Sequence, residues 1–109
     1  MHIVLDNRKI NIKKANNFFK KLIGFMGKKN ITYGILFPKT NSIHTFFMKD
    51  NIDVIALNNQ NEVILHAVNV PKNKIIAVNN SLKNTNILEL PKNTSNNIKI
   101  GDYITFIEQ

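Results

Sequence analysis

From Tyr33 to the C-terminus, apolar residues occur in short segments, and this punctuation limits what the chain can fold into. The longest apolar run has only about five residues. Polar groups of Asn and Asp separate some segments, and proline ends three others, at Pro38, Pro71 and Pro91. Proline has no N–H to donate to a sheet, and Asn and Asp favour turns, so both interrupt strands. The pattern predicts about seven to nine short strands joined by turns.

One segment near the N-terminus has helical spacing instead. Its apolar residues recur at intervals of three and four, as on one face of a helix, at Phe18, Phe19, Leu22, Ile23 and Met26. Asn17 can cap the first turn, and Gly24 can end the helix in a left-handed conformation. A helix of about two turns is not stable alone, so we expect it to pack on a sheet. We therefore predict an α+β fold, mostly antiparallel β, with a small barrel-like sheet and one short N-terminal helix.

Length and composition predict one self-sufficient domain over residues 1–109. Of these residues 43% are hydrophobic and 20% are charged, which is typical of a packed domain and not of a disordered chain. The chain has no cysteine, so it forms no disulfide and no thiolate metal site. Polar residues interrupt the apolar stretch after Leu5, and no segment is long enough to span a bilayer. We therefore expect a cytoplasmic protein.

The chain is basic, with 15 Lys and Arg residues against 7 Asp and Glu, a net charge of +8. Such a charge is typical of proteins that bind nucleic acid, an anionic membrane or an acidic partner. However, the basic residues are scattered, and Arg8 is the only arginine, although phosphate and base recognition favour the guanidinium group. Lys, Asn and Ile all have AT-rich codons, so the charge also fits compositional drift on a solvated surface. Nucleic-acid binding stays an alternative that we do not favour.

A set of short motifs follows a characteristic order: Ala15-x-Asn17, Lys21, Gly24-Phe-Met26, Gly34-Ile-Leu-Phe37, Ile43-His-Thr-Phe-Phe-Met-Lys49, Ile52-Asp-Val-Ile55, Leu88-Glu-Leu-Pro91 and Ile100-Gly-Asp102. This order resembles the uncharacterised bacterial and archaeal family known as domain of unknown function 192, or uncharacterised protein family 0127. The resemblance extends from Ala15 to Phe106. It implies a small β-rich α+β domain and no particular activity. Lys21 stands where the family usually has Arg, and Phe47 where many members have Trp.

Side chains suited to ligand binding gather between Ile43 and Asp53. Within this segment lie an imidazole, two aromatic rings, a thioether, an ammonium group and a carboxylate, and the candidate site residues among them are His44, Phe47, Met48, Lys49 and Asp53. A few polar groups around an apolar patch are what a small-molecule pocket requires. An alternating strand from Ile43 to Lys49 would put His44 and Met48 on one face and Phe47 and Lys49 on the other.

Two carboxyl groups fall within apolar strands. Asp53 begins a run of apolar residues, where a carboxylate is costly unless it is hydrogen-bonded or paired. We expect it to accept from the backbone of the Asp50-Asn51 turn or to pair with Lys49 or Lys21. Glu89 lies between Leu88 and Leu90, and we expect its side chain to face outward.

Three functions fit these residues. The first is a non-enzymatic binding or accessory domain for a small molecule or a protein, with a pocket bordered by His44, Phe47, Met48, Lys49, Asp53 and Glu89. A protein partner would use Phe25-Met26. The second is a hydrolase or lyase in which His44 works with Asp53 or Glu89. The third is a nucleic-acid-binding module with Phe46 or Phe47 as a stacking platform. We expect no cofactor and no metal, because the three histidines lack a metal-ligand spacing.

Overall fold

The computed structural model of the chain describes residues 1–108, with every side chain in that range except those of Phe18, Phe19 and Leu22. The predicted packing of the Phe18, Phe19 and Leu22 stripe on a sheet therefore lies outside the described residues. Among residues 1–108, no helix is long and apolar enough to cross a membrane.

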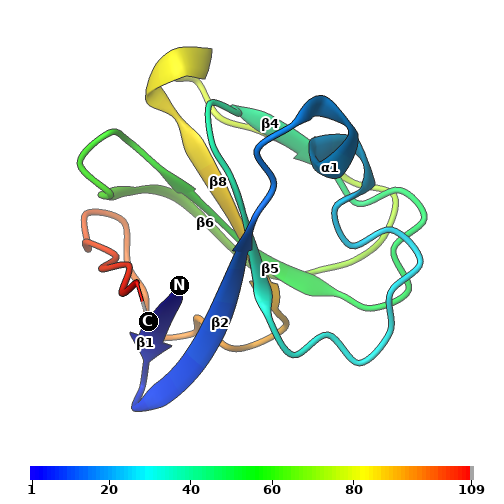
Figure 1. The fold of residues 1–109 in the computed structure, drawn as a ribbon, viewed down its shortest axis with the longest axis horizontal. Coiled ribbons are helices and arrows are strands. Elements are labelled where there is room, and N and C mark those ends of the chain that lie inside the picture. The colour runs from blue at the N-terminus through cyan, green and yellow to red at the C-terminus, as the bar shows by residue number, and fades with distance from the viewer. Residues whose placement is uncertain (109) are drawn as a thin grey trace.

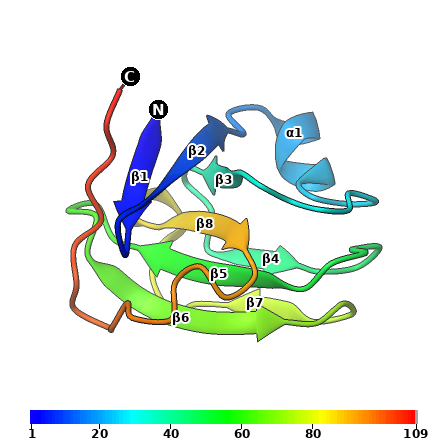
Figure 2. The ribbon, with the colours of Figure 1, turned by 90° about the horizontal axis from the view of Figure 1, so that it is seen from below.

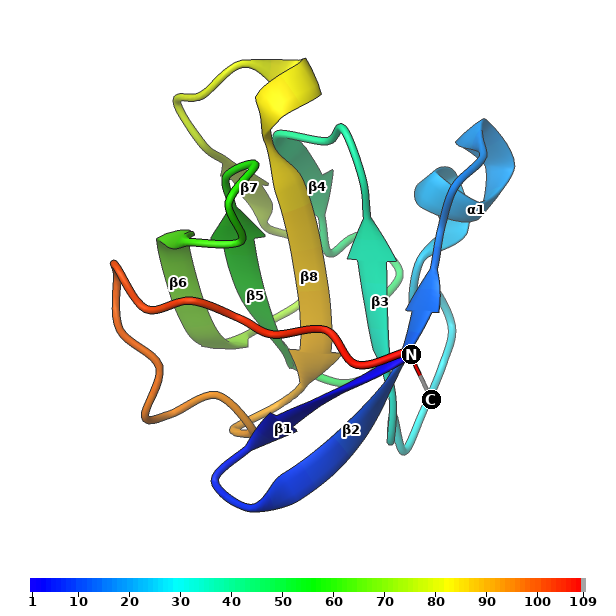
Figure 3. The ribbon, with the colours of Figure 1, turned by 60° about the vertical axis from the view of Figure 1, so that its left-hand side comes forward.

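The chain forms one large sheet and one small sheet (Figures 1 and 3). In spatial order, the large sheet contains β1 (His2–Leu5), β2 (Arg8–Lys14), β3 (Gly34–Phe37), β8 (Asn86–Pro91), β5 (Ile52–Leu57) and β6 (Val63–Val70). Neighbouring strands are antiparallel except for β2 and β3, which are parallel. The small sheet pairs β4 (Ser42–His44) with β7 (Ile75–Ala77), and a 3-10 turn, η1 (Leu82–Asn84), precedes β8.

Local turn chemistry explains several of these strands. Asp6 and Asn7 both have positive φ, at 49° and 63°, as the tight turn between β1 and β2 requires. Asn61 and Asn73 likewise take left-handed conformations in the turns on either side of β6. The predicted turns at these polar residues are therefore present. The expected barrel-like curvature is also present, because the large sheet curls along its length (Figure 3).

The predicted α+β class is wrong, because the chain is nearly all sheet, with 42% of it in strands and 6% in helix. The helical spacing produces only α1 (Phe18–Ile23), six residues that Asn17 caps and Gly24 ends. So short a segment is no helical layer. It lies past the end of β2 and covers neither face of the sheet as a layer would (Figure 2).

The central strands β5, buried along its whole length, and β8, buried from Ile87 to Pro91, separate two apolar clusters. The first core contains side chains from β1, β2 and the C-terminal segment together with Ile55, Leu57, Leu88 and Leu90. The second core contains Phe25, Phe37, Met48, Val54 and Ile87. Successive residues of a strand point to opposite faces, so each strand serves both cores. Each of these strands carries one acidic residue among its apolar residues, Asp53 in β5 and Glu89 in β8.

Candidate functional site

A cavity of about 420 Å³ opens beside the second core, between the end of α1, the β3–β4 connection, β4 and β8. This volume lies in the range of small-molecule sites. Its walls are mostly apolar and include Ile23, Phe37, Ile43, Met48 and Leu82. Its polar side chains are those of Lys21, Thr40, Ser42, His44 and Glu89.

Glu89 is buried at the wall of this cavity, although the sequence predicts an outward-facing side chain. In the sheet it lies opposite Val54 on one side and Ile35 on the other, so it shares their face, which is that of the second core. Only 2% of the residue is exposed, and its Oε1 atom has no hydrogen-bond partner among the described residues. Burial raises the pKa of Glu89 to about 8, because a charged carboxylate is poorly solvated there. The carboxyl group is therefore mostly protonated at neutral pH.

Gly24 keeps the cavity open next to this carboxyl group. A Cβ atom on Gly24 would lie 3.3 Å from Cζ of Phe37 and 3.5 Å from Oε1 of Glu89. Its φ of +48° also favours glycine. The backbone N–H of Gly24 donates to the carbonyl of Lys20 at 3.0 Å, so it leaves Glu89 without a partner.

His44 and Met48 border the same cavity as Glu89. The ring of His44 stacks on that of Phe46, with centroids 5.0 Å apart. Its Nδ1 atom accepts a hydrogen bond from the N–H of Phe46 at 3.2 Å, so the neutral ring carries its proton on Nε2. The structure thus brings together three of the predicted site residues, His44, Met48 and Glu89.

Phe47 and Lys49 lie outside the cavity lining, because the predicted strand from Ile43 to Lys49 ends at His44. The reason is Thr45, which is fully buried and exchanges hydrogen bonds with the chain at Pro71 and Lys74. The N–H of Met48 donates to the carbonyl of Thr45 at 3.2 Å and closes a turn. Phe47 sits in this turn with φ of 63° and is 73% exposed.

Asp53 faces the first core, so it does not share the cavity of His44 and Glu89. It is fully buried and accepts four hydrogen bonds. Oδ1 accepts from the N–H groups of Asn69 and Asn93, both at 2.9 Å, and Oδ2 accepts from the N–H of Ser95 at 3.0 Å and its Oγ at 2.5 Å. These partners differ from the Asp50-Asn51 turn and the lysines that the sequence predicts. Asp53 thereby fastens the turn after β8 to strands β5 and β6.

Ser95 and His66 extend this network, and sequence reasoning missed both. The Nε2 atom of His66 lies 2.9 Å from Oγ of Ser95. Ser95 is 1% exposed and donates to Asp53, so its hydroxyl is unsuited to act as a nucleophile. No sequence signal links these residues, because 29 positions separate His66 from Ser95 and 42 separate Asp53 from Ser95.

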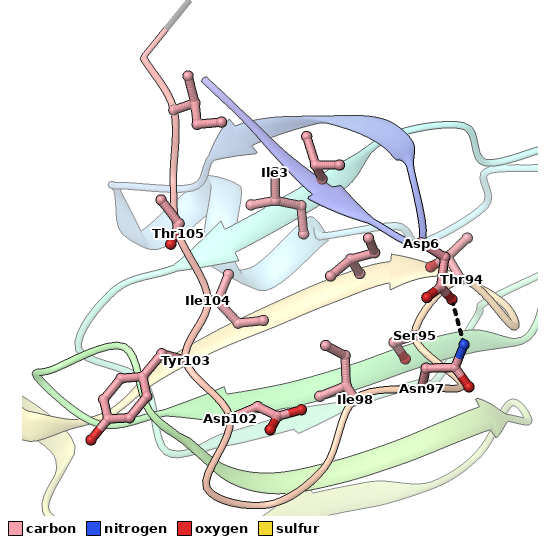
Figure 4. A pocket seen from close by; sticks show the side chains of 13 residues that line it. Ile3, Asp6, Thr94, Ser95, Asn97, Ile98, Asp102, Tyr103, Ile104 and Thr105 are labelled. Carbon is pink, nitrogen blue, oxygen red and sulfur yellow. Dashed lines mark hydrogen bonds between the residues drawn. The ribbon is translucent and has the colours of Figure 1, made fainter.

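A second hollow, of about 400 Å³, lies between β1 and the C-terminal segment (Figure 4). Its acidic groups already have partners. Asp6 Oδ2 accepts from Asn97 Nδ2 at 3.0 Å, and Asp102 Oδ2 accepts from the N–H of Lys99 at 2.9 Å (Figure 4 shows the first bond). With its polar groups satisfied in this way, the second hollow is a weaker candidate than the cavity at Glu89.

Two other expectations concern partners and metals. Phe25 is fully buried in the second core and Met26 is half-buried, so the predicted exposure of the Phe25-Met26 patch is wrong for Phe25, and a protein partner stays a prediction. Among residues 1–108, no group of three or more His, Cys, Asp or Glu side chains is arranged to hold a metal ion.

Comparisons with solved structures support the fold. A protein of unknown function from Novosphingobium aromaticivorans DSM 12444 superposes with a TM-score of 0.79 at 14% identity, covering 96% of this chain and 82% of that one. A protein from Sinorhizobium meliloti 1021, described as a candidate transcription regulator, superposes with a TM-score of 0.78 at 13% identity, covering 95% and 89%. Identities this low show similarity of fold alone.

Sequence comparison identifies the family. A UPF0127 protein of Thermococcus sibiricus (strain DSM 12597 / MM 739) is 41% identical over 59 residues, a match that covers 49% of this chain and 38% of that protein. Residues 1–106 match the family DUF192, described as "Uncharacterized ACR". The chain therefore belongs to the DUF192 family, which its ordered motifs resemble.

Proposed function

We propose that this chain is a binding domain for a small amphipathic molecule, which enters the cavity at Glu89. The observation that carries the proposal is the unpartnered Oε1 atom of a buried carboxyl group at the wall of that cavity. A buried polar atom without a partner destabilises a protein by about 1 to 3 kcal/mol. Such a group is therefore rare in a native structure and is most easily explained by a ligand that supplies the missing partner.

The protonation state of Glu89 limits the chemistry of the ligand. Because burial raises its pKa to about 8, the group at neutral pH is a carboxylic acid that donates one hydrogen bond. It therefore suits a carbonyl or carboxylate oxygen of the ligand. Among the described residues that line the cavity, Lys21 is the one lysine or arginine and Glu89 is the one acid. An organic acid with an apolar body fits this arrangement better than an amine does.

Saturation-transfer NMR tests the proposal with a mixed panel of apolar organic acids, amides and amines. We expect hits among the acids and amides, and we expect their affinity to fall as the pH rises through about 8. Glu89→Gln keeps an N–H donor, so it retains binding within about threefold without this pH dependence, whereas Glu89→Leu weakens binding at least about tenfold. Glu62→Gln, at a carboxylate bonded to Asn58, is the matched control and leaves binding unchanged. Hits that are insensitive to Glu89→Leu, or hits confined to amines, overturn the proposal.

Acid–base catalysis in the same cavity is a second candidate. The observation that favours it is that His44 and Glu89, a carboxyl group whose pKa burial raises to about 8, border one cavity. Any compound that binds is tested for turnover by NMR over hours. Conversion that both Glu89→Gln and His44→Ala abolish supports catalysis, and an unchanged compound removes it. The extent of the domain, residues 1–109, and a cytoplasmic location stay predictions.

A further inference from the structure

The turn that carries Phe47 forms, with its neighbours, an apolar tip surrounded by lysines. We propose that this tip, made of Phe46, Phe47, Ile75, Lys49, Lys72 and Lys74, docks on an anionic lipid bilayer. The apolar side chains enter the boundary between headgroups and acyl chains, and the lysines lie against the headgroups. This inference does not depend on which ligand the Glu89 cavity binds.

The tip is held rigidly by backbone contacts among three loops. The N–H of Thr45 donates to the carbonyl of Lys74 at 2.9 Å, and its hydroxyl donates to the carbonyl of Pro71 at 2.7 Å. The N–H of Lys74 donates back to the Thr45 hydroxyl at 2.9 Å, and the N–H of Gly27 donates to the carbonyl of Phe47 at 2.9 Å. A turn that these hydrogen bonds already hold in place loses little conformational freedom when it binds a surface.

Phe47 occupies an unfavourable position by two criteria. A φ of 63° is rare for a bulky side chain, and a large aromatic ring that is 73% exposed gains little from folding. Strained backbone and exposed apolar surface both persist more readily where they serve a function. Phe46 is less exposed, at 37%, because its ring stacks on that of His44, so it forms the more covered edge of the tip and Phe47 its most exposed part.

A second exposed apolar side chain lies beside this turn. Ile75 is 70% exposed. In the small sheet it pairs with His44, which lies two residues before Phe46 in the sequence. Paired residues of antiparallel strands place their side chains on the same face. β4 ends at His44 and β7 begins at Ile75, so the backbone of Ile75 and the turn that carries Phe47 lie at the same end of the small sheet (Figure 3).

The charges around the tip are complementary to an anionic surface. A shallow depression at Phe47 is also lined by Met26, Gly27, Met48, Lys49, Lys72 and Asn73, and none of the described residues in this lining is acidic. Lys74 is exposed next to them. The nearby Asp50 accepts a hydrogen bond from the N–H of Asn30 at 2.7 Å. Lysines around exposed apolar side chains are typical of segments that bind anionic bilayers.

The same residues fit a single nucleic-acid strand less well. Binding of single strands uses a series of aromatic rings along a groove, and here Phe46 is already stacked on His44. Ile75 offers no flat face on which a base could stack. Lysine also lacks the planar guanidinium group of arginine, which binds a phosphate through two parallel hydrogen bonds. An acyl boundary, by contrast, accepts both Phe47 and Ile75. Met48 borders both the depression and the Glu89 cavity, so a docked bilayer would lie next to that cavity.

Vesicle co-sedimentation tests this inference with the intact chain. We expect at least about tenfold stronger binding to phosphatidylcholine vesicles that contain about 30% phosphatidylglycerol than to pure phosphatidylcholine vesicles, and we expect added salt to weaken it. Phe47→Ser lowers this binding at least about tenfold. Tyr103→Ser is the matched control, because Tyr103 is 66% exposed on the C-terminal segment, and it changes binding less than about twofold.

Phe47→Gly separates docking from folding. Glycine adopts positive φ without strain, so this variant unfolds at the same or a higher urea concentration than the wild type and still loses vesicle binding. The inference is overturned if the wild type does not bind the anionic vesicles at low salt, or if Tyr103→Ser weakens binding as much as Phe47→Ser. Phe47-dependent binding to an oligothymidylate strand without vesicle binding would assign the tip to nucleic acid instead.

Discussion

Asp53 and Glu89 are two buried carboxyl groups on neighbouring strands, and their surroundings differ in almost every respect. In the register of β5 and β8, Asp53 pairs with Leu90 and Glu89 pairs with Val54, so the two side chains lie one residue apart on opposite faces of the sheet. Both are at most 2% exposed. Asp53 accepts four hydrogen bonds, whereas Oε1 of Glu89 accepts none among the described residues.

The comparison shows that burial alone does not identify a functional carboxyl group. Asp53 is compensated by N–H and O–H donors from β6 and from the turn after β8, so it joins these two segments and leaves nothing for a ligand to satisfy. Glu89 borders a cavity, and its Oε1 has no such donor among the described residues. The difference assigns Asp53 to the scaffold and makes Glu89 the candidate site, and four predictions test or refine that division.

Asp53→Ala has the largest expected effect. It leaves three N–H groups and one hydroxyl without their acceptor in a buried network, so we expect the free energy of unfolding to fall by roughly 3 to 5 kcal/mol. Urea unfolding monitored by circular dichroism measures the change, with Glu62→Gln as a reference. A loss below about 1 kcal/mol would show that the turn after β8 is held against β5 and β6 by other contacts.

The pH dependence of stability is the second test, and its sign follows from the raised pKa of Glu89. Between the ordinary glutamate pKa of 4.5 and the raised pKa of about 8, the folded state keeps the Glu89 proton while the unfolded state releases it. Stability therefore falls as the pH rises through this window, by roughly 3 to 5 kcal/mol in total. The difference in unfolding free energy between wild type and Glu89→Gln isolates this contribution. A difference that stays constant from pH 4 to pH 9 contradicts the assignment.

Glu89→Met is expected to stabilise the chain by about 1 to 2 kcal/mol at pH 7, because it replaces an unsatisfied polar group with an apolar one of similar length. Urea unfolding gives the value. The same substitution at a compensated position would destabilise, so a destabilised Glu89→Met variant would mean that Glu89 has a partner after all.

Ser95→Ala has the smallest expected effect, a loss of about 1 kcal/mol in unfolding free energy. It removes one of four hydrogen bonds to Asp53 and the bond to His66, while the N–H of residue 95 still donates to Asp53. Urea unfolding of Ser95→Ala and Asp53→Ala side by side ranks the two. A Ser95→Ala loss as large as that of Asp53→Ala would place the hydroxyl, and not the backbone, at the centre of the network.

The elements that the sequence predicted well depend on neighbouring residues. The Asp6-Asn7 turn and the strands that end at Pro71 and Pro91 follow from local conformational preferences. The α+β class failed because local spacing indicates that a helix starts, but not that it ends after six residues and forms no layer.

The candidate site was only partly predictable for a related reason. His44, Met48 and Glu89 were recognised as chemically suitable residues, and the structure brings these three to one cavity. The partners of Asp53 could not be deduced, because Asn69, Asn93 and Ser95 are 16, 40 and 42 positions away and mostly use backbone N–H groups. The face on which Glu89 points depends on strand order, with β8 between β3 and β5, which no local pattern encodes.

The most direct test is an NMR titration of the Glu89 side-chain carboxyl carbon in the wild-type chain, with Glu89→Gln used to assign its signal. The account predicts a midpoint near pH 8, because burial disfavours the charged carboxylate and Oε1 has no hydrogen-bond partner among the described residues. It also predicts that the midpoint changes when a cavity ligand is bound. A midpoint near the ordinary value of 4.5 would contradict the account, since it would show that water or a cation such as Lys21 already stabilises the carboxylate.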